Sequence, residues 1–346
     1  MPNRIAALYG DYSGPEMMRA GLAVLDAVSQ KNDFEFQIEA YPFGGEAIDQ
    51  VGDPLPEQTL AGCQAADAIL LSAIGGPKWS VGAQSPEAGL LKIRQELGLF
   101  ANIRPTHIDQ AIIDRSPVKA EIIENTDFVI VRELTSGIYF GQPREEGTER
   151  AIDTTVYRRA EVERIVKVAF EYAQRRQKHI TVVDKANVLA TSWMWRAIVA
   201  EIQPAYPEIE VDYMYVDAAS MKIIAEPLFF DVIVTDNLFG DILSDEAAVL
   251  PGSLGMIPSI SQGASGKTLY EPIHGSAPTL ANQDRINPIS MIRSVSLMLR
   301  YTFDRADMAD QIEAAISKTL AQGIMTGDIG GSAKTSEMVA KIIENL

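Results

Sequence analysis

The sequence contains only one cysteine, Cys63, among its 346 residues. One cysteine cannot form a disulfide within the chain, and it cannot supply a thiolate-based metal site. No stretch of about twenty apolar residues is free of charge, so a membrane-spanning helix is not expected. An acidic residue, Asp11, also follows the N-terminus too closely for the apolar region of a secretory leader to precede it. We therefore expect a cytoplasmic protein that has no membrane partner.

Basic residues are scarce relative to acidic ones. The chain has 30 Lys and Arg against 47 Asp and Glu, which gives a net charge of -17. Such a charge repels phosphate backbones and anionic membranes, so nucleic acid is not an expected partner. An anionic small substrate would need its own local cluster of arginines.

The usual phosphate-binding fingerprints are also missing. No G-x-G-x-x-G follows any apolar run, so the sequence does not predict a Rossmann fold. The fragment G-A-S-G-K-T at Gly263–Thr268 is not a P-loop, because Ser261 stands where a P-loop requires glycine. We expect a flexible turn there.

Hydrophobic periodicity indicates an α/β protein. Each of several short apolar runs is followed by an amphipathic stretch. The pairs, with the apolar run first, are Ile5–Tyr9 with Glu16–Gln30; Ala68–Ile74 with Pro86–Leu97; Ile180–Val183 with Leu189–Ile202; Val211–Val216 with Met221–Ala225; and Asp231–Thr235 with a helix carrying Asp241. Two further helices are predicted over Pro288–Phe303 and Met308–Gln322. The length predicts two domains, and the Gly- and Pro-rich joins near Gly98–Pro105 and Pro251–Pro258 are where the chain is expected to cross between them.

The segment Phe128–Tyr157 departs from this alternation. It combines a β-rich run, F-V-I-V-R-E, with a turn and a polar stretch over Gln142–Arg150. We interpret it as an antiparallel excursion, of a kind that often contacts a partner subunit.

Asp241 and Asp245 form the first candidate site. They lie four residues apart in a predicted helix and therefore share one face. Like charges at that spacing repel, so a compensating group is expected, and a divalent cation with oxygen ligands is one candidate. A solvated acidic face near a helix start remains the alternative.

Three arginines could form the anion site. Arg94 lies on a predicted helix, Arg104 follows in F-A-N-I-R-P, and Arg132 stands inside an apolar strand, where an unpaired guanidinium would be costly. Together they could grip a substrate that bears two carboxylates, since guanidinium binds carboxylate in a bidentate manner. Each could also have a surface or structural role.

Proton-transfer and ligand-binding candidates follow from three other segments. Lys185 ends an apolar run and could act as a base, while Tyr139 near cationic groups could donate a proton. Both residues are also common in ordinary structural positions. The segment Tyr270–Pro278 predicts a rigid turn rich in backbone donors for an anionic or nucleotide ligand, with His274 structural or functional.

The ordered motifs of the chain resemble those of the isocitrate/isopropylmalate dehydrogenase family, nearly from end to end. The matching segments are G-D-x-x-G-P-E at Gly10–Glu16, A-I-G-G-P-K-W at Ala73–Trp79, Ser85–Pro105, V-R-E-L-T-S-G-I-Y-F-G at Val131–Gly141, D-K-A-N-V-L at Asp184–Leu189, Tyr215–Met221, T-D-N-L-F-G-D-I-L-S-D-E at Thr235–Glu246, and E-P-I-H-G-S-A-P at Glu271–Pro278. The E-L-T-x-G-I-Y-F-G form resembles the isopropylmalate branch.

The resemblance implies an enzyme of leucine biosynthesis. It would oxidise and decarboxylate 3-isopropylmalate to 2-oxoisocaproate, with NAD as cofactor and Mg²⁺ or Mn²⁺ as metal. The alternatives are a related enzyme acting on homoisocitrate, isocitrate or tartrate, a metal-dependent phosphohydrolase, and a catalytically silent metabolite-binding relative.

The resemblance also assigns residues. Asp217, Asp241 and Asp245 are expected to hold the metal, Arg94, Arg104 and Arg132 the malate carboxylates, and Lys185 and Tyr139 the proton-transfer roles. Glu87, Leu90, Leu91 and Val188 are expected around the isopropyl group and the nicotinamide. NAD is expected over the turn of His274, Gly275, Ser276, Ala277 and Pro278, with Asn287 and the loop of Gly75, Gly76 and Pro77 nearby.

The implied fold has two α/β lobes with a central sheet, and is not a Rossmann fold. Residues 1–99 and 252–346 would form the cofactor-binding lobe, and residues 100–251 the dimerisation and metal/substrate lobe. A homodimer is implied, with Lys185 and Asp217 acting across the subunit boundary.

Two positions depart from the family pattern. Thr279 stands where NAD-using members usually carry aspartate and NADP-using isocitrate enzymes carry lysine, so neither charge is present there. Leu280 replaces the tyrosine common in the NADP type, so NAD is favoured, while Arg285 leaves room for a 2′-phosphate. Tyr12-Ser13 replaces the usual Gly-Ile and removes the backbone freedom of a glycine.

Overall fold

The computed structural model describes residues 3–79 and 84–346, which divide into two units. Unit 1 comprises Met1–Leu99, Asp109–Ser116 and Pro251–Leu346, and unit 2 comprises Phe100–Ile108 and Pro117–Leu250. The sequence predicts the whole of 100–251 as one lobe. The structure instead places Asp109–Ser116 and Pro251 with the chain ends, because Asp109 accepts a hydrogen bond from Ser317 and lies beside Arg293.

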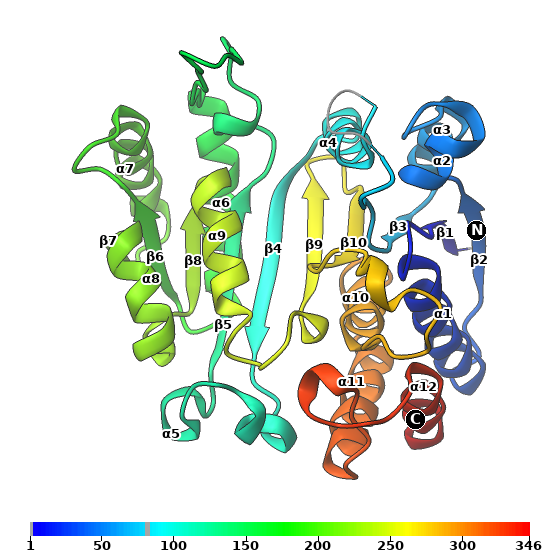
Figure 1. Cartoon of the computed structure of the whole chain (residues 1–346). Helices are drawn as coiled ribbons and strands as arrows, with labels where there is room; N and C mark the ends of the chain where they lie inside the picture. Colours follow the sequence, from blue (N-terminus) through cyan, green and yellow to red (C-terminus); the bar gives the residue numbers. More distant parts are fainter. Residues whose placement is uncertain (1–2, 80–83) are drawn as a thin grey trace. The chain divides into compact units, whose positions relative to one another are not determined.

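Unit 1 contains five of the described strands, in the order β2-β1-β3-β10-β9. The first four are mutually parallel, and β9 pairs antiparallel with β10. The elements, drawn in Figure 1, are β1 (Asn3–Leu8), α1 (Gly14–Lys31), β2 (Phe36–Tyr41), α2 (Gly45–Val51), α3 (Glu57–Ala65), β3 (Ala68–Leu71), α4 (Pro86–Glu96), β9 (Pro258–Gly263), β10 (Thr268–Pro272), α10 (Ile289–Tyr301), α11 (Ala306–Ala321) and α12 (Thr335–Asn345).

The core of unit 1 forms because its central strands are apolar on both faces. All four residues of β3 are buried, as expected for a parallel strand that is covered on both sides. Helix α10 packs on β10 and β9, and α1 and α11 pack against α10. The predicted helices at 16–30, 86–97, 288–303 and 308–322 correspond to α1, α4, α10 and α11.

Unit 2 has the strand order β4-β5-β8-β6-β7, in which β4 runs antiparallel to β5 and the remaining pairs are parallel. Its elements are β4 (Leu99–His107, beginning at the last residue of unit 1), α5 (Ala120–Ile123), β5 (Asp127–Glu133), α6 (Arg159–Gln174), β6 (His179–Asp184), α7 (Ala190–Ile202), β7 (Glu210–Tyr215), α8 (Val216–Ala225), β8 (Val232–Thr235) and α9 (Asn237–Ala247). Helix α6 packs on β5, β6 and β8, and α9 packs on β5 and β8.

The irregular segment 128–157 is only partly the excursion predicted. Its first run is β5, a buried strand of the unit 2 sheet that is antiparallel to β4. Beyond it, the described residues contain a short 3-10 helix at Gly137–Tyr139 and an isolated antiparallel bridge between Glu145 and Ile152. The Gly263–Thr268 segment is the turn between β9 and β10, as expected, with Gly266 at φ 81.

The two units confirm the α/β class, and ten strands are seen among the described residues. None of the described helices is long and apolar enough to cross a membrane.

Candidate functional site

Helix α9 begins directly after a buried strand and carries the acidic pair. Asp236 follows β8 and caps the helix. Its side chain accepts a hydrogen bond from the backbone N–H of Phe239 at 2.8 Å. Polar residues then follow at intervals of three and four positions: Asn237, Asp241, Ser244 and Asp245. This spacing places them on one face of α9. Since α9 packs on β5 and β8, this polar face is fixed by the buried strand before it.

The arginines of unit 2 come from the antiparallel pair β4 and β5. Arg132 of β5 is paired in register with Asn102 of β4, and Arg104 lies two residues beyond Asn102 on the same face of the sheet. Gly240 of α9 lies against the Arg132 side chain, where a Cβ would come within 2.6 Å of it. A glycine at this point therefore lets the helix approach the arginine closely.

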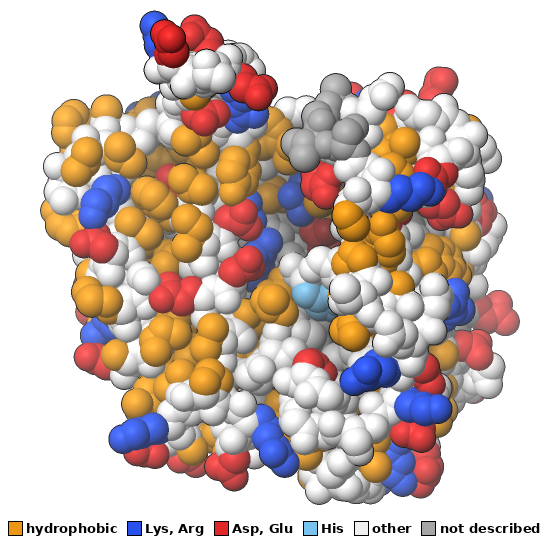
Figure 2. Space-filling view, in the orientation of Figure 1, with side chains coloured by type: hydrophobic (Ala, Val, Ile, Leu, Met, Phe, Trp, Pro, Cys, Tyr) orange, Lys and Arg blue, Asp and Glu red, His pale blue; other side chains and the backbone are white. Residues whose placement is uncertain are grey.

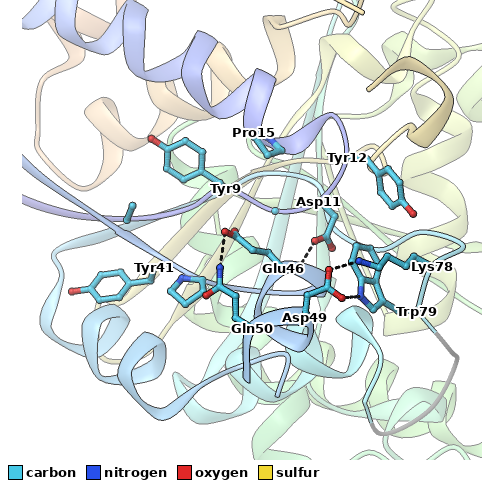
Figure 3. A pocket seen from close by; sticks show the side chains of 13 residues that line it. Tyr9, Asp11, Tyr12, Pro15, Tyr41, Glu46, Asp49, Gln50, Lys78 and Trp79 are labelled. Atoms are coloured by element: carbon cyan, nitrogen blue, oxygen red, sulfur yellow. Dashed lines mark hydrogen bonds and ion pairs between the residues drawn. The ribbon is translucent and has the colours of Figure 1, made fainter. Parts of the chain in front are cut away.

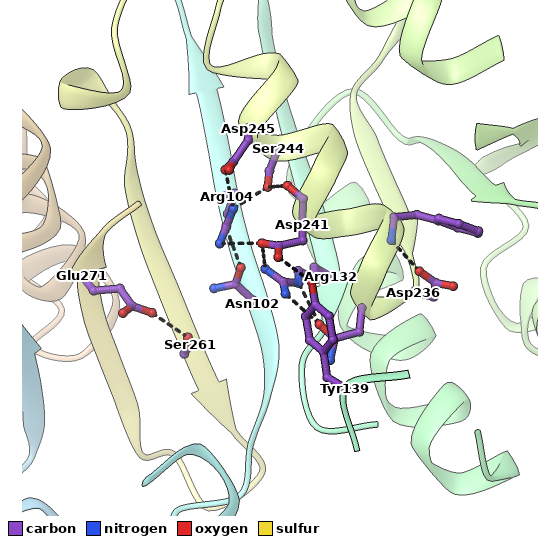
Figure 4. Close-up of polar contacts among 12 residues, drawn as sticks. Asn102, Arg104, Arg132, Tyr139, Asp236, Asp241, Ser244, Asp245, Ser261 and Glu271 are labelled. Carbon is purple, nitrogen blue, oxygen red and sulfur yellow. Dashed lines mark hydrogen bonds and ion pairs between the residues drawn. The ribbon is translucent and has the colours of Figure 1, made fainter. Parts of the chain in front are cut away.

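The two arginines converge on the acidic face of α9 (Figure 4). Arg132 Nη1 donates to Asp241 Oδ1 at 2.5 Å, and its Nε and Nη2 donate to Asn237 Oδ1 at 3.1 and 2.8 Å. Arg104 Nη1 lies 3.2 Å from Asp245 Oδ1, and its Nη2 lies 3.6 Å from Asp241 Oδ1. Both guanidinium groups are buried while Asp245 remains 61% exposed, so one carboxylate faces solvent.

The charges of this cluster compensate one another. Burial opposes ionisation of Asp241, but Arg132 and Arg104 outweigh it and hold the pKa of that carboxyl below its usual range. Burial raises the pKa of Asp245, against the opposing effect of Arg104. The compensating group that the acidic spacing required is thus, within this chain, a pair of guanidinium groups.

Tyr139 belongs to the same cluster. Its hydroxyl donates to Asp241 Oδ2 at 2.8 Å, and the guanidinium of Arg132 lies 5.8 Å from its ring centroid. Burial, together with the bond to Asp241, raises the pKa of Tyr139 to about 12. The phenol therefore keeps its proton at neutral pH, which a proton donor requires.

The donor set of α9 fits part of a divalent cation site. Asp241 and Asp245 offer hard oxygen ligands one helical turn apart, and Mg²⁺ commonly takes one or two carboxylates and completes its shell with water and substrate oxygens. Within the described residues of this single chain, no group of three or more His, Cys, Asp or Glu could hold a metal ion. The third expected ligand, Asp217, is engaged elsewhere.

Asp217 pairs with Lys185 at the edge of unit 2. Asp217 lies in the first turn of α8, Lys185 follows β6, and Lys185 Nζ is 2.5 Å from Asp217 Oδ1. The hydrogen bond from Lys185 lowers the pKa of Asp217. The Asp217 side chain is 64% exposed, whereas that of Lys185 is 28% exposed, so the carboxylate is the more accessible member of the pair. The structure thus brings Lys185 and Asp217 together. Among the described residues of this chain, Asp217 does not form a group of three carboxylates with Asp241 and Asp245.

Arg94, the third predicted arginine, lies in unit 1. It is buried in the last turn of α4, and its Nη2 donates to Glu271 Oε1 of β10 at 2.9 Å. The strand therefore positions the guanidinium. Leu90, one turn earlier, is partly buried against the core of unit 1, whereas Val188 of unit 2 is 64% exposed.

The turn that follows β10 lines a cavity of about 720 Å³ within unit 1. Its lining includes His274, Gly275, Ala277, Leu280, Arg285, Ile286, Asn287, Asp328 and Lys334. Thr279 is exposed and does not line it. Both the volume and the mixture of apolar and polar groups suit a small-molecule ligand.

Two observations favour a bound ligand in this cavity. The ring atom Nε2 of His274 is buried and has no hydrogen-bond partner among the described residues, so a ligand group could satisfy it. A Cβ added at Gly275 would meet nothing within 4 Å, so the backbone there borders open space. Burial lowers the pKa of His274, which keeps the imidazole neutral at pH 7.

The loop Gly75–Pro77 is held from several sides. Gly75 N–H donates to Asp11 Oδ2 at 2.8 Å, and Gly75 O accepts from Ser276 Oγ at 2.6 Å. Glu87 of α4 places its carboxylate directly against Gly75, where an added Cβ would come within 2.3 Å of Oε1. Ser276 thus joins two segments that the sequence assigned to the cofactor, and Glu87 contacts one of them.

Several residues of the site were not predicted from the sequence. Asn237 and Asn102 each accept hydrogen bonds from an arginine, and Ser244 Oγ lies 2.5 Å from Arg104 Nη1. Their spacing was a usable signal: Asn102 lies two residues from Arg104 on a strand, and Asn237 and Ser244 lie four and three residues from Asp241 on a helix. Glu271, which holds Arg94, gave no local signal because its partner is distant in sequence.

Comparison with known proteins places this arrangement in a family. A family model described as isocitrate/isopropylmalate dehydrogenase matches residues 4–342. A 3-isopropylmalate dehydrogenase of Listeria monocytogenes is 54% identical over 346 residues, covering 100% of this chain and 99% of that protein. One of Streptococcus thermophilus is 53% identical and both chains are covered fully, at 100%. The crystal structure of isocitrate dehydrogenase from Methylococcus capsulatus superposes with a TM-score of 0.89 at 33% identity, covering 100% of this chain and 99% of that one. The chain belongs to the isocitrate/isopropylmalate dehydrogenase family, as its motifs indicated.

Proposed function

We propose that this protein oxidises and decarboxylates 3-isopropylmalate, reducing NAD and releasing 2-oxoisocaproate and CO₂, as a step of leucine biosynthesis. The observation that carries the proposal is the cluster in which Arg104, Arg132 and Tyr139 meet Asp241 and Asp245 of α9. It combines guanidinium donors, carboxylates and a protonated phenol at one place. The 54% identity to a 3-isopropylmalate dehydrogenase over the full length supports the choice of substrate.

Arg104 and Arg132 would bind the carboxylates of the malate. Each guanidinium has several N–H donors in one plane, and Asn102 and Asn237 fix the orientation of the two groups. Arg94, fixed by Glu271 in unit 1, is proposed to contribute a further guanidinium. Such pairing gives both affinity and register, because planar guanidinium and carboxylate match in geometry.

Asp241 and Asp245 would hold Mg²⁺ or Mn²⁺, with Asp217 as the third ligand. A divalent cation at this place supplies Lewis acidity, which lowers the pKa of the substrate hydroxyl and stabilises negative charge after CO₂ leaves. The exposed Asp245 carboxylate supports this role, since it can turn towards a ligand in solvent.

Lys185 and Tyr139 would move the protons. Lys185 is proposed to help remove the hydroxyl proton as hydride passes to the nicotinamide, and Tyr139 to protonate the carbon that loses CO₂. Tyr139 suits the second role because its proton is retained at neutral pH and its position is fixed by Asp241. Removing one positioned proton donor typically lowers the rate by roughly 10²–10⁴-fold.

NAD is the proposed cofactor, bound in unit 1. The cavity beside His274, with Asn287 in its lining, would take the nucleotide, and the loop Gly75–Pro77 with Glu87 would contact the nicotinamide half. His274 Nε2 supplies a buried polar atom for the nucleotide to satisfy. Leu90 and Val188 are proposed near the isopropyl group.

We further propose a homodimer in which each active site takes Lys185 and Asp217 from the partner. The Asp217 side chain of this pair is 64% exposed and is therefore accessible to a partner. Large exposed apolar side chains on α7, α8 and α9 support an interface there, because exposed apolar surface often marks a site of protein–protein contact. Trp193, Met221 and Ile242 are 58%, 69% and 56% exposed. Figure 2 shows apolar side chains gathered over the part of unit 2 where α8 and α9 lie.

The cytosol is the proposed compartment. The one cysteine, Cys63, is buried and free, which suits a reducing environment.

A substrate-by-cofactor matrix tests the function. Purified protein is assayed for NADH or NADPH formation with 3-isopropylmalate, homoisocitrate, isocitrate and tartrate, each with Mg²⁺ and again with EDTA. We expect turnover of 3-isopropylmalate with NAD, abolished by EDTA. Turnover of another malate but not of 3-isopropylmalate would reassign the substrate, and phosphatase activity without any nicotinamide would overturn the reaction class.

A further inference from the structure

The loop Gly10–Gly14 connects the two segments proposed to bind the cofactor. Both the backbone N–H and the Oγ of Ser13 donate to the carbonyl oxygen of Ser276, at 3.1 and 2.5 Å. Ser276 Oγ in turn donates to Gly75 O at 2.6 Å. Ser13 is fully buried, so its two bonds are shielded from water and cannot be exchanged for solvent without exposing the loop.

Asp11 anchors the same loop from the other side. Its buried carboxylate accepts from the backbone N–H groups of Gly75, Gly45 and Glu46, at 2.8, 3.0 and 3.0 Å. The loop Gly10–Gly14, the loop Gly75–Pro77 and the start of α2 therefore meet at one side chain, which Figure 3 shows beside Glu46 and Tyr12. The bonds of Asp11 and Ser13 therefore hold the loop Gly10–Gly14 in place independently of Tyr12.

Tyr12 packs its ring on the Gly75–Pro77 loop. The ring lies so close to Gly76 that no Cβ would fit between them. Its edge also meets Trp79, with ring centroids 5.6 Å apart and an interplanar angle of 70°. This edge-to-face arrangement is a favourable one for two aromatic rings. Both tyrosine and tryptophan line a cavity of about 600 Å³ (Figure 3).

The backbone of Tyr12 is in a conformation that side chains other than glycine rarely adopt. Its φ is 52°, in the left-handed region. A non-glycine residue there incurs a conformational cost that must be offset by contacts elsewhere. The ring contacts with Gly76 and Trp79 are the contacts that this conformation makes possible.

We propose that Tyr12 and Ser13 are positioning residues for the dinucleotide: Ser13 fixes the turn at Ser276, and the Tyr12 ring fixes Gly76. This inference rests on the proposed binding of NAD at these two segments. The contacts of Ser13 and Tyr12 form within the chain itself. The free energy of cofactor binding is therefore not spent on ordering these loops. Neither residue is assigned a part in hydride or proton transfer.

The test for Ser13 uses a matched control. Ser13→Ala removes one buried hydroxyl bond to a carbonyl. Thr59→Val does the same at Thr59, whose buried Oγ1 donates to Pro42 O at 2.7 Å and which belongs to neither cofactor segment. Amide hydrogen exchange is measured without cofactor, and the NAD Kd by calorimetry. We expect Ser13→Ala to speed exchange at Gly75–Pro77 and to raise the NAD Kd about fivefold. Thr59→Val should lower the melting temperature without changing the NAD Kd.

Tyr12 is tested with three variants. Tyr12→Phe keeps the ring and should bind NAD as the wild type does. Tyr12→Ala and Tyr12→Gly both lose the ring and should weaken NAD binding by about threefold to tenfold, while Tyr12→Gly melts higher than Tyr12→Ala because glycine tolerates the left-handed backbone. In each weakened variant the KM for NAD should rise while kcat and the KM for 3-isopropylmalate stay within about twofold of wild type.

The outcomes separate this inference from the proposed function. If the wild type binds NAD but Ser13→Ala and Tyr12→Ala bind it equally well, the positioning role is wrong and the proposed function stands. The positioning role is also wrong if Ser13→Ala and Thr59→Val weaken binding alike, since the effect would then be general destabilisation. A wild type that binds no NAD overturns the proposed cofactor and this role together.

Discussion

Arg132 and Asp241 are joined by a charge-assisted hydrogen bond of 2.5 Å between Nη1 and Oδ1, on the buried side of α9. Asp241 uses its other oxygen to accept from Tyr139. The carboxylate of Asp241 thus links Arg132, proposed to bind the substrate, to Tyr139, the proposed proton donor. Any ligand that draws Asp241 away from Arg132 changes the surroundings of both at once.

Replacing Arg132 with lysine should damage substrate binding more than folding. Lysine keeps the positive charge but loses the planar fork that reaches Asn237 and Asp241 together. We expect kcat/KM for 3-isopropylmalate to fall about 100-fold, or ~2.7 kcal/mol, with the NAD Kd unchanged. Steady-state kinetics measure kcat/KM, and calorimetry measures the NAD Kd. Arg150→Lys, at an exposed arginine, is the control, and an equal fall in both variants would contradict the assignment.

Tyr139→Phe should slow decarboxylation more than hydride transfer. The variant keeps the ring against Arg132 but lacks the proton that the phenol holds. Deuterium and ¹³C kinetic isotope effects distinguish the two steps: the ¹³C effect should grow and the deuterium effect shrink relative to wild type. If both steps slow to the same degree, Tyr139 does not have the role proposed.

Mixing two strongly impaired variants tests whether active sites are shared between subunits. If Lys185 serves the partner's site, a dimer of one Lys185→Met and one Tyr139→Phe subunit contains one intact site. After random exchange of an equimolar mixture, activity should recover to about a quarter of wild type, because half of the dimers are mixed and each has one working site. Each variant alone is the control. No recovery, with subunit exchange verified by mass, would show that each chain builds its own site.

The imidazole of His274, whose Nε2 is buried, should make stability depend on pH. Burial holds its pKa below 6.5 in the folded protein, so the unfolded chain binds more protons as the pH falls through 6.5. The contribution to the free energy of unfolding is therefore lost on acidification, with a limiting slope of about 1.4 kcal/mol per pH unit. Urea titrations at pH 7.5 and 5.5 should show a larger loss for wild type than for His274→Gln. Equal losses would mean that His274 titrates as in the unfolded chain.

The elements of the fold could be predicted because their signals are local. Helices α1, α4, α10 and α11 were visible as amphipathic stretches, and several strands as apolar runs. Arg132 was conspicuous for a physical reason: a guanidinium in an apolar strand needs buried partners, and the structure supplies Asp241 and Asn237.

Features that depend on long-range pairing were not accessible. The register that sets Asn102 opposite Arg132 arises between two antiparallel strands and leaves no trace in either one alone. Asp109–Ser116 joins unit 1 through Asp109, whose partner Ser317 is distant in the sequence. For Tyr12, the loss of glycine freedom could be seen in the sequence, but the ring contacts that accompany the left-handed backbone could not.

The proposed mechanism requires that the acidic face of α9 hold a divalent cation together with a diacid. The decisive measurement is a calorimetric titration of 3-isopropylmalate, with and without Mg²⁺, into wild type and Asp241→Asn. Wild type should bind the substrate at least about tenfold more tightly with Mg²⁺, whereas Asp241→Asn, folded by its melting curve, should show no such difference. If Mg²⁺ leaves the affinity of the wild type unchanged, the cation does not share this site with the substrate, and the proposed mechanism is wrong.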